Sequence, residues 1–169
     1  MRFPIGIQNF RTLREDDYLY IDKTELIYKL VDTGRYYFLS RPRRFGKSLL
    51  VSTLEAYFQG KKELFKGLAM ERLEKDWTVR PVFHLDLNVG KYESTQSLLD
   101  TLNEALTVWE QEYGAAEAER NVGLRFKGVV QRAYEKTGYR VAILVDEYDK
   151  PLLQNIGNNE LQEELRGIL

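Results

Sequence analysis

Two short groups of residues in this chain have the types and spacing that phosphoryl-transfer chemistry requires. The first is Gly46-Lys47-Ser48, inside the basic stretch "RPRRFGKSLL". In a phosphate-binding loop, or Walker A motif, the glycine lets the backbone approach phosphate, the lysine neutralises charge and the serine binds Mg²⁺. The second is Asp146-Glu147, which follows an apolar run. In a Walker B motif the Asp holds the magnesium shell, and a Glu directly after it can accept a proton from the attacking water.

The first group departs from the generic phosphate-loop pattern at one position. That pattern has a glycine five residues before Gly46, where this chain has Arg41. Two other interpretations of the stretch therefore stay open. It can be a solvated basic turn, or a loop in which Arg41, Arg43 and Arg44 contact nucleic acid. The motif alone does not separate the three hypotheses.

The residues around the first group have the arrangement that a phosphate loop needs. The β-rich run "RYYFLS" at 35–40 predicts a strand, and 47–58 has apolar residues at helical spacing, with Gly60 placed to end the helix. A strand, a tight loop and a helix together present backbone N–H groups and a positive dipole end to the phosphates. The predicted nucleotide-binding residues are Arg43, Arg44, Phe45, Gly46, Lys47, Ser48 and Leu49.

The second group lies at the end of a predicted strand. "YRVAILVDEYDKP" is a nearly continuous β-branched and aliphatic run, which is typical of a strand buried on both faces. Asp146 and Glu147 come at its carboxyl end, where adjacent carboxylates are costly unless they are paired, hydrated or close to a metal. The alternative is an exposed turn, which Asp149 and Pro151 would help to form. Because both groups follow predicted strands in the expected order, together they are more specific than either alone.

Strands and helices alternate along the rest of the chain. Helices are expected at 22–33, from Ser94 to Tyr113, at 124–136 and at 158–168, with short helical turns at 61–76 and a strand at 81–87. This alternation favours an α/β fold in three layers with a mostly parallel sheet.

Composition and charge exclude several other classes of site. The 169 residues fit one compact domain, and a net charge of −1 argues against a dedicated nucleic-acid binder. There is no cysteine and His84 is the only histidine, which excludes thiolate nucleophiles, cysteine-ligated zinc and multi-histidine metal sites. A bound metal would be a hard cation with oxygen ligands, such as Mg²⁺. No apolar run approaches the roughly 20 residues that span a bilayer, so a cytoplasmic protein is expected.

A few polar and aromatic residues have simpler structural interpretations. Asp22 and Thr24 are placed to cap the helix that follows them, and a position near the nucleotide is the alternative. Asp86, near the carboxyl end of its predicted strand, can face the site. Trp77 and Trp109 are expected to fill the core or a groove.

Several phrases of the sequence resemble the bacterial AAA-ATPase-like family. They include "YLYIDKTELIYKLVDTGRYYFLSRPRRFGKSLL", "PVFHLDL" and "VAILVDEYDKPLL", and the resemblance covers nearly the whole chain. "RPRRFGKS" and "DEYDKPL" are similar to the family's own forms of the two nucleotide motifs, so Arg41 departs from the generic loop but not from the family's version. The resemblance implies a P-loop NTPase-like core that binds ATP and Mg²⁺. In many members a PD-(D/E)XK nuclease-like domain follows, which implies nucleic acid as a partner through that domain, and assembly into an oligomer is compatible with the family.

The resemblance also implies a strand that carries a polar sensor residue and a later helix that carries an arginine finger. The residues after Asp149 predict a loop and a helix, so neither feature is visible in the chain. We therefore expect 1–169 to be a fragment, the N-terminal part of an AAA-ATPase-like P-loop domain whose sheet is incomplete.

These inferences lead to one functional hypothesis with two alternatives. The chain is expected to bind Mg-ATP, with ATP hydrolysis in the intact protein. Lys47 and Glu147 are the predicted catalytic residues, and Ser48 and Asp146 are the predicted magnesium ligands. One alternative is a non-catalytic switch that senses nucleotide, and the other is a nucleic-acid-binding module that uses the arginine-rich loop.

Overall fold

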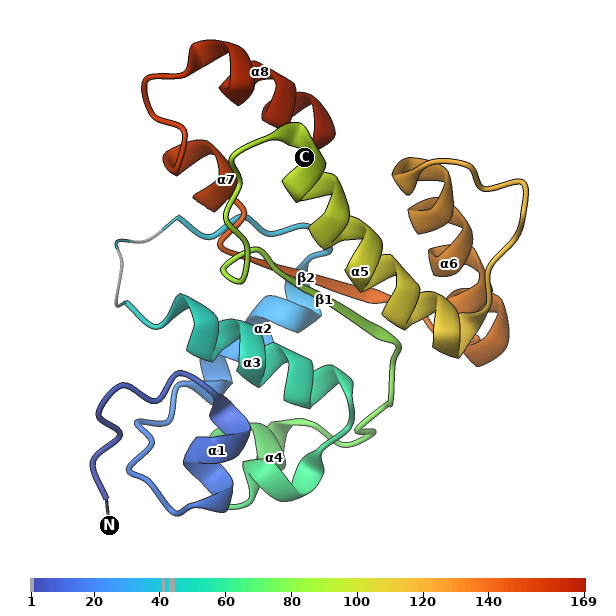
Figure 1. Cartoon of the computed structure of the whole chain (residues 1–169). Helices are drawn as coiled ribbons and strands as arrows, with labels where there is room; N and C mark the ends of the chain where they lie inside the picture. The colour runs from blue at the N-terminus through green and yellow to red at the C-terminus, as the bar shows by residue number, and fades with distance from the viewer. Residues whose placement is uncertain (1, 41, 43–44) are drawn as a thin grey trace. The chain divides into compact units, whose positions relative to one another are not determined.

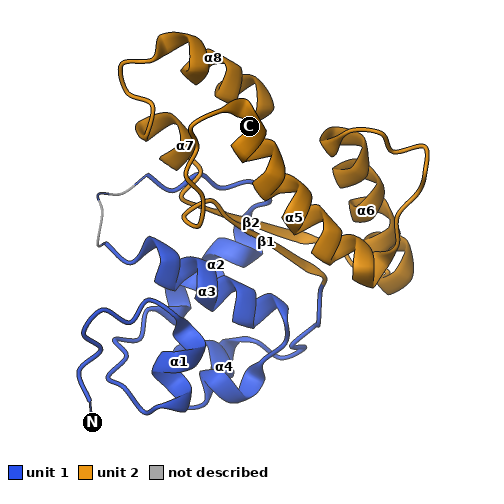
Figure 2. Ribbon diagram, in the orientation of Figure 1, with its two compact units in different colours: residues 1–80 blue, residues 81–169 orange. Residues whose placement is uncertain are grey.

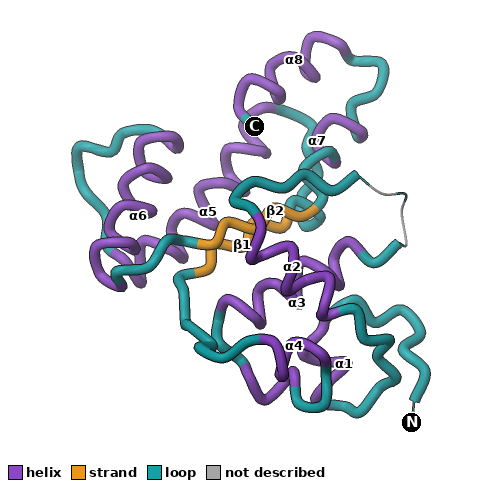
Figure 3. Tube along the Cα trace, turned by 180° about the vertical axis from the view of Figure 1, so that it is seen from behind, coloured by secondary structure: helices purple, strands orange, loops and turns teal. Residues whose placement is uncertain are grey.

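A computed structural model describes residues 2–40, 42 and 45–169 of the chain (Figure 1). The chain forms two compact units, residues 1–80 and residues 81–169 (Figure 2). Helices predominate, and a two-stranded parallel sheet lies in the second unit (Figure 3). The described residues therefore have a mixed α/β fold, as the sequence predicts in coarse outline. None of the helices in these ranges is long and apolar enough to cross a bilayer.

The first unit is built from short helices. Their bounds are α1 Phe10–Glu15, α2 Thr24–Thr33, α3 Lys47–Phe58, the 3-10 helix η1 Lys62–Phe65 and α4 Ala69–Leu73. The helices predicted at 22–33 and 47–58 and the helical turns at 61–76 are confirmed. Local signals explain the agreement, because apolar residues recur at helical spacing and Gly34 and Gly60 follow the ends of α2 and α3.

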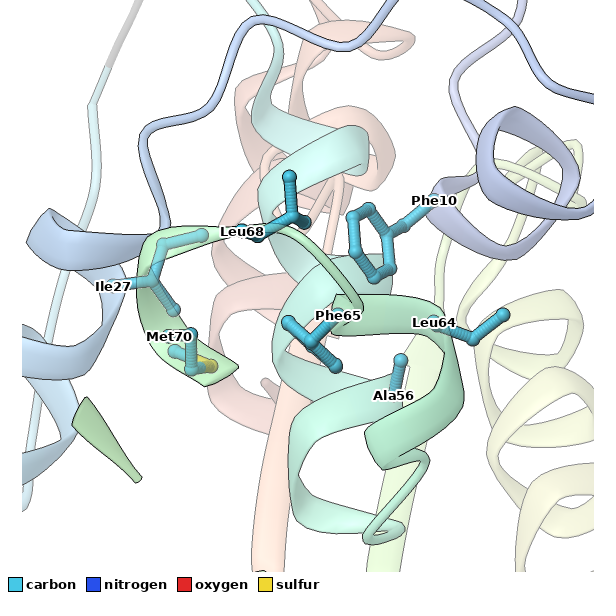
Figure 4. Packing of buried hydrophobic residues seen from close by; sticks show 7 residues of the cluster. All are labelled: Phe10, Ile27, Ala56, Leu64, Phe65, Leu68 and Met70. Carbon is cyan, nitrogen blue, oxygen red and sulfur yellow. The ribbon is translucent and has the colours of Figure 1, made fainter. Parts of the chain in front are cut away.

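The helices of the first unit enclose one hydrophobic core (Figure 4). Its buried side chains are Phe10, Ile27, Ala56, Leu64, Phe65, Leu68 and Met70. The ring centroids of Phe10 and Phe65 lie 4.9 Å apart in a tilted arrangement. α1 packs on α3, and α2 packs on α4. Because Ala56 lies in this core and Leu49 packs against it, the core positions the helix that begins at Lys47.

The prediction of a strand at 35–40 is wrong. These residues are irregular, and the side chains of Tyr36 and Phe38 are 95% and 70% exposed. A strand needs a neighbouring strand to pair its backbone groups, and the described residues of the first unit contain only an isolated β-bridge. The hydroxyl of Tyr37 instead donates to the carbonyl oxygen of Leu30 (2.5 Å). That carbonyl is one of the last in α2 and has no partner within the helix.

In the second unit each strand is followed by two helices. Its elements are β1 Val82–Asp86, α5 Thr95–Tyr113, α6 Val122–Thr137, β2 Ala142–Asp146, α7 Lys150–Leu153 and α8 Asn159–Ile168. Each strand and helix predicted in this part of the chain is confirmed, and the short helix α7 is one that the sequence pattern did not indicate. The caps also form as expected. The hydroxyl oxygen of Ser94 accepts from the backbone N–H of Ser97 (3.2 Å), and Gly138 ends α6 in a left-handed conformation.

The two strands are parallel and pair in register, from Val82 opposite Ala142 to Asp86 opposite Asp146. Parallel neighbours need a long crossover connection, and α5 and α6 provide it. The buried ring of Phe83 packs in a core with side chains of both helices. The carboxyl ends of β1 and β2 therefore lie at the same edge of the sheet.

The prediction that β2 is buried on both faces is wrong for one face. Ile143 and Val145 are 46% and 44% exposed. A strand is covered on both sides only where further layers pack on each side of its sheet. In the described part of the chain the sheet consists of β1 and β2, and the apolar side chains of Ile143 and Val145 stay largely uncovered.

Ion pairs join α6 to α5 and to the loop between them. The guanidinium of Arg125 donates to both carboxylate oxygens of Glu110 (2.9 and 2.6 Å). Hydrogen bonding from Arg125 lowers the pKa of the Glu110 carboxyl. Arg132 binds both oxygens of Glu119 in the same way (2.6 and 3.0 Å). Because such bidentate pairs are directional, they help to fix the orientation of α5 and α6 relative to each other.

Candidate functional site

The predicted phosphate loop enters α3 through a left-handed residue. Gly46 has φ 74° and ψ 25° and immediately precedes the helix. Among the described residues no atom would lie within 4 Å of a Cβ at this position, so the backbone conformation is the feature that favours glycine there. The carbonyl oxygen of Gly46 accepts the first helical hydrogen bond, from the N–H of Leu50 (3.0 Å). The chain therefore turns from the loop into the helix at Gly46.

Lys47 and Ser48 lie in the first turn of α3. The first N–H groups of a helix have no acceptor within the helix, and they carry the positive end of its dipole. Among the residues that the structure describes, neither the ammonium of Lys47 nor the hydroxyl of Ser48 has a hydrogen-bond partner. Leu49 packs on the core of the first unit, whereas Phe45 is 63% exposed. The structure thus brings a cation, a hydroxyl and the first amides of a helix to one helix end.

The remaining cations of the stretch cannot be placed in this way. Arg41, Arg43 and Arg44 lie outside the described residues. Their predicted contacts with phosphate or nucleic acid therefore stay predictions.

A hydrogen bond ties the middle of α3 to the start of α1. The hydroxyl oxygen of Ser52 accepts from the N–H of Phe10 (3.0 Å) at the start of α1. The buried hydroxyl of Thr53 donates to the carbonyl oxygen of Leu49 (2.7 Å). The bond of Thr53 lies within α3, whereas the bond of Ser52 to Phe10 and the packing of Leu49 hold the helix against the core of the first unit.

Asp22 and Thr24 form hydrogen bonds at the starts of two helices. One carboxylate oxygen of Asp22 accepts from the N–H of Thr24 (2.9 Å), and the other accepts from the N–H of Ala69 (2.7 Å). The hydroxyl oxygen of Thr24 accepts from the N–H of Met70 (3.0 Å). Burial opposes ionisation of Asp22, but hydrogen bonds from Thr24 and Ala69 outweigh it and lower the pKa of the carboxyl. The contact of Asp22 with the N–H of Thr24 supports its predicted role at the start of α2, whereas the hydroxyl of Thr24 binds the start of α4 and not of its own helix.

The predicted carboxylates of the second unit lie at the carboxyl edge of the sheet. Asp146 ends β2 and is only 7% exposed, and its side chain accepts from the N–H of Glu147 (2.9 Å). Asp86 ends β1 directly opposite Asp146, and its side chain accepts from the N–H of Asn88 (2.8 Å). The register therefore brings Asp86 to the same edge as the predicted magnesium ligand Asp146.

The backbone of Glu147 has a conformation that nothing in the sequence indicated. Its φ is 52°, a left-handed value that costs a non-glycine residue about 1–2 kcal/mol. The N–H of Lys150 donates to the carbonyl oxygen of Glu147 (3.0 Å) and closes the turn. Strained residues persist only where their surroundings over-determine them, and they are frequent at active sites. Glu147, the predicted general base, therefore has a strained backbone conformation directly after the end of β2.

Sequence reasoning also missed two neighbours of this turn. The ammonium of Lys150 donates to the backbone carbonyl oxygen of Asn88 and to its side-chain oxygen, the latter at 3.1 Å. One carboxylate oxygen of Asp149 is buried without a hydrogen-bond partner among the described residues. The sequence pattern contains no signal for the first contact, because Lys150 and Asn88 are 62 positions apart.

The predicted magnesium ligands are a hydroxyl, Ser48, in the first unit and a carboxylate, Asp146, in the second. Both are hard oxygen donors, which suits Mg²⁺, and this ion usually keeps waters and phosphate oxygens as its remaining ligands. Within the described ranges, no three acidic or histidine side chains gather into a metal site made by protein alone. Each of these two residues thus has the type of donor atom that Mg²⁺ prefers.

Comparison with known proteins adds a family assignment. A model of the AAA-ATPase-like family, whose description is "Predicted AAA-ATPase", matches residues 4–169. A protein of Azotobacter chroococcum mcd 1, named as an uncharacterized protein in the vnfD 5′ region, is 44% identical over 167 residues. That alignment covers 98% of this chain but only 32% of the relative. No solved structure matches the chain. Because the family model spans nearly the whole sequence, the chain belongs to the AAA-ATPase-like family.

Proposed function

We propose that this protein binds Mg-ATP and that its full-length form hydrolyses ATP. The observation that carries the proposal is the pair Asp146-Glu147 at the carboxyl end of a parallel strand, with the Asp almost buried and the Glu in a strained backbone conformation. Membership of the AAA-ATPase-like family supports nucleotide as the ligand. The left-handed Gly46 at the start of α3 supports a phosphate-binding role for the other motif.

In this proposal the loop before α3 binds the phosphates. The backbone amides at Gly46 and the first turn of α3 donate to phosphate oxygens, and Lys47 neutralises charge on the β and γ phosphates. Arg43 and Arg44 add positive charge, and Phe45 and Leu49 flank the loop. The adjoining helix gives these groups a fixed direction, because it is anchored in the core of the first unit.

The carboxylates of the second motif act on the metal and the water. Ser48 and Asp146 would hold Mg²⁺, which would supply positive charge to the phosphate oxygens when bound. Glu147 takes a proton from a water whose oxygen attacks the γ-phosphorus. The bond between that phosphorus and the β–γ bridging oxygen breaks, which yields ADP and phosphate. Phosphoryl transfer depends mainly on positioning and electrostatics, so Lys47 contributes by stabilising charge on the bridging oxygen.

The wider architecture is part of the same proposal. We assign 1–169 to the N-terminal part of a three-layer P-loop NTPase-like domain with a mostly parallel sheet. The Azotobacter relative is about three times as long as this chain, since the chain covers 32% of it. That length is compatible with a further domain, such as a nuclease-like one that acts on nucleic acid, and with assembly into an oligomer.

Calorimetric titration with Mg-ATP tests the binding step. Lys47→Ala is expected to raise Kd at least about tenfold, because a charge-assisted hydrogen bond contributes roughly 1.5–3 kcal/mol. Lys62→Ala is the matched control, since Lys62 is an exposed lysine of the same unit. Equal affinities for the wild-type protein and Lys47→Ala would contradict the phosphate loop. DNA binding that is lost in a variant with both Arg43→Ala and Arg44→Ala, but kept in Lys47→Ala, would favour the nucleic-acid alternative.

Turnover by the full-length protein tests the hydrolytic step. Glu147→Gln is expected to lower kcat by roughly 10²–10⁴-fold, the usual contribution of a general base, and to leave Kd for Mg-ATP unchanged. Glu104→Gln, on the exposed side of α5, is the matched control. Hydrolysis that survives Glu147→Gln would remove Glu147 from the base role. A protein that binds Mg-ATP, shows no turnover and keeps its output in Glu147→Gln would be a nucleotide-sensing switch.

A further inference from the structure

The side chain of one lysine joins the turn after β2 to the loop after β1. The side chain of Lys150, at the start of α7, donates from its ammonium to both oxygens of Asn88, in the loop after β1. The same residue donates its backbone N–H to the carbonyl oxygen of Glu147 (3.0 Å). Lys150 therefore contacts the proposed general base through its backbone and the neighbouring loop through its side chain. We refer to the contact between Lys150 and Asn88 as the Lys150–Asn88 bridge.

The loop on the far side of the bridge is itself held at the strand ends. The N–H of Asn88 donates to the side chain of Asp86 (2.8 Å), and the N–H of Leu87 donates to the carbonyl oxygen of Asp146 (3.0 Å). Asp146 in turn accepts from the N–H of Glu147 (2.9 Å). These hydrogen bonds and the Lys150–Asn88 bridge form one network at the carboxyl edge of the sheet.

The strained backbone of Glu147 needs surrounding contacts that hold it in place. With φ 52° this residue would relax toward a right-handed or extended conformation if its turn were released. Such a change would redirect its carboxylate. Tyr92 joins the loop after β1 to Gln154 and Asn155 at the far end of α7, whereas the side chain of Lys150 joins that loop to the turn of Glu147 itself. The ammonium of Lys150 is therefore placed to restrain the direction of the Glu147 side chain.

We propose that Lys150 is a positioning residue for the general base Glu147, and that it acts through the Lys150–Asn88 bridge. This inference rests on the proposed function. Two of the three N–H donors of the Lys150 ammonium are directed to the oxygens of Asn88, and Lys150 is assigned no contact with ATP. Its effect is therefore expected in the chemical step and not in nucleotide affinity.

Steady-state hydrolysis by the full-length protein tests this role. Lys150→Met keeps the length of the side chain but removes the donor, and it is expected to lower kcat on the order of 10–100-fold with KM unchanged. Lys150→Arg, which can donate to the same oxygens, is expected to recover most of kcat. Lys127→Met, at an exposed lysine of α6 in the same unit, is the control and is expected to behave as wild type. An unchanged kcat in Lys150→Met, or a raised KM with unchanged kcat, would overturn the proposal.

A double variant separates positioning from an independent contribution. If Lys150 acts through Glu147, adding Lys150→Met to Glu147→Gln is expected to lower kcat little further, because the base is already absent. A full multiplicative loss in the double variant would show that Lys150 acts on the reaction by another route and would overturn the proposal.

Hydrogen exchange measures the bridge without any turnover. The backbone amide at position 150 is expected to exchange faster in Lys150→Met than in Lys127→Met. The second unit is expected to melt at the same temperature in both variants. Unchanged exchange would overturn the bridge even if ATP hydrolysis is present. If the wild-type protein neither binds nor hydrolyses ATP, the proposed function fails, and the catalytic role of Lys150 fails with it. Faster exchange in Lys150→Met would then show the bridge as a structural contact only.

Discussion

Replacing Gly46 with alanine tests whether the turn into α3 needs a left-handed residue. Gly46 has φ 74°, and a Cβ there would meet no atom of the described part of the chain within 4 Å. The loss in free energy of unfolding for Gly46→Ala is therefore expected to come from the backbone conformation alone, about 1–2 kcal/mol, with no steric contribution from the described residues. We expect the free energy of unfolding of the first unit to fall by that amount and the affinity for Mg-ATP to fall as well.

Two other glycines make this comparison quantitative. Gly138 has φ 73° and equally open surroundings, so Gly138→Ala is expected to cost the same about 1–2 kcal/mol in the second unit and to leave nucleotide affinity unchanged. At Gly60 a Cβ would lie 2.7 Å from Cγ2 of Val79 and 3.1 Å from the carbonyl oxygen of Trp77. Gly60→Ala is therefore expected to cost more than Gly46→Ala.

The assay uses the two tryptophans, one in each unit. Trp77 packs on Phe65 (5.1 Å between ring centroids) in the first unit, and Trp109 stacks on Phe83 (4.5 Å) in the second. Urea unfolding followed by fluorescence in a Trp109→Phe background reports the first unit, and a Trp77→Phe background reports the second. A loss below about 0.5 kcal/mol for Gly46→Ala, the size of an ordinary surface substitution, would refute the argument from backbone strain. Equal nucleotide affinity for Gly46→Ala and Gly138→Ala would refute the phosphate-binding role.

Three further predictions concern contacts within each unit. Asp22→Asn is expected to destabilise the first unit by about 1–2 kcal/mol at pH 7, because two helix starts lose a charged acceptor. Folding lowers the pKa of the Asp22 carboxyl, so its contribution to the free energy of unfolding is fully present above the unfolded pKa near 3.9. That contribution is lost as pH falls through the lower folded pKa. In urea unfolding between pH 7 and pH 3, the stabilities of the wild-type protein and Asp22→Asn should therefore converge. Arg125→Met is expected to cost about 1–3 kcal/mol in urea unfolding of the second unit, whereas Arg166→Met, at an exposed pair, is expected to cost less than about 0.5 kcal/mol. Phe83→Ala, at a fully buried ring, is expected to cost about 3–5 kcal/mol in thermal or urea unfolding of the second unit, and a loss below about 1 kcal/mol would contradict its place in the core.

Much of the helical structure could be predicted because its signals are local. α3 follows from apolar residues at helical spacing, and α5 follows from Ser94 as a cap. A cap or a glycine stop acts through hydrogen bonds and torsions within a few residues, so the same residues have the same effect in most tertiary contexts. The parallel strands β1 and β2 were also predictable, because their apolar runs are short and end in turn residues.

Predictions about strands at 35–40 and about the faces of β2 failed for a different reason. Tyr36 and Phe38 have high strand propensity, but propensity forms no strand without a partner for the backbone groups. Likewise, the apolar residues Ile143 and Val145 indicate a covered strand, but coverage depends on which other layers pack over the sheet. Neither a partner nor a covering layer is encoded in the residues of the strand itself.

The sequence by itself determined the family, the limits of most helices and the two groups, Gly46-Lys47-Ser48 and Asp146-Glu147, that could act on phosphate. These properties depend on residue types at short spacing, which can be read along the chain. Only the tertiary structure decided that Asp86 lies opposite Asp146, that Glu147 is left-handed and that Lys150 donates to Asn88. The physical reason is that register, backbone strain and the bridge arise when segments about 60 positions apart pack at one edge of a sheet, and no local pattern specifies that meeting.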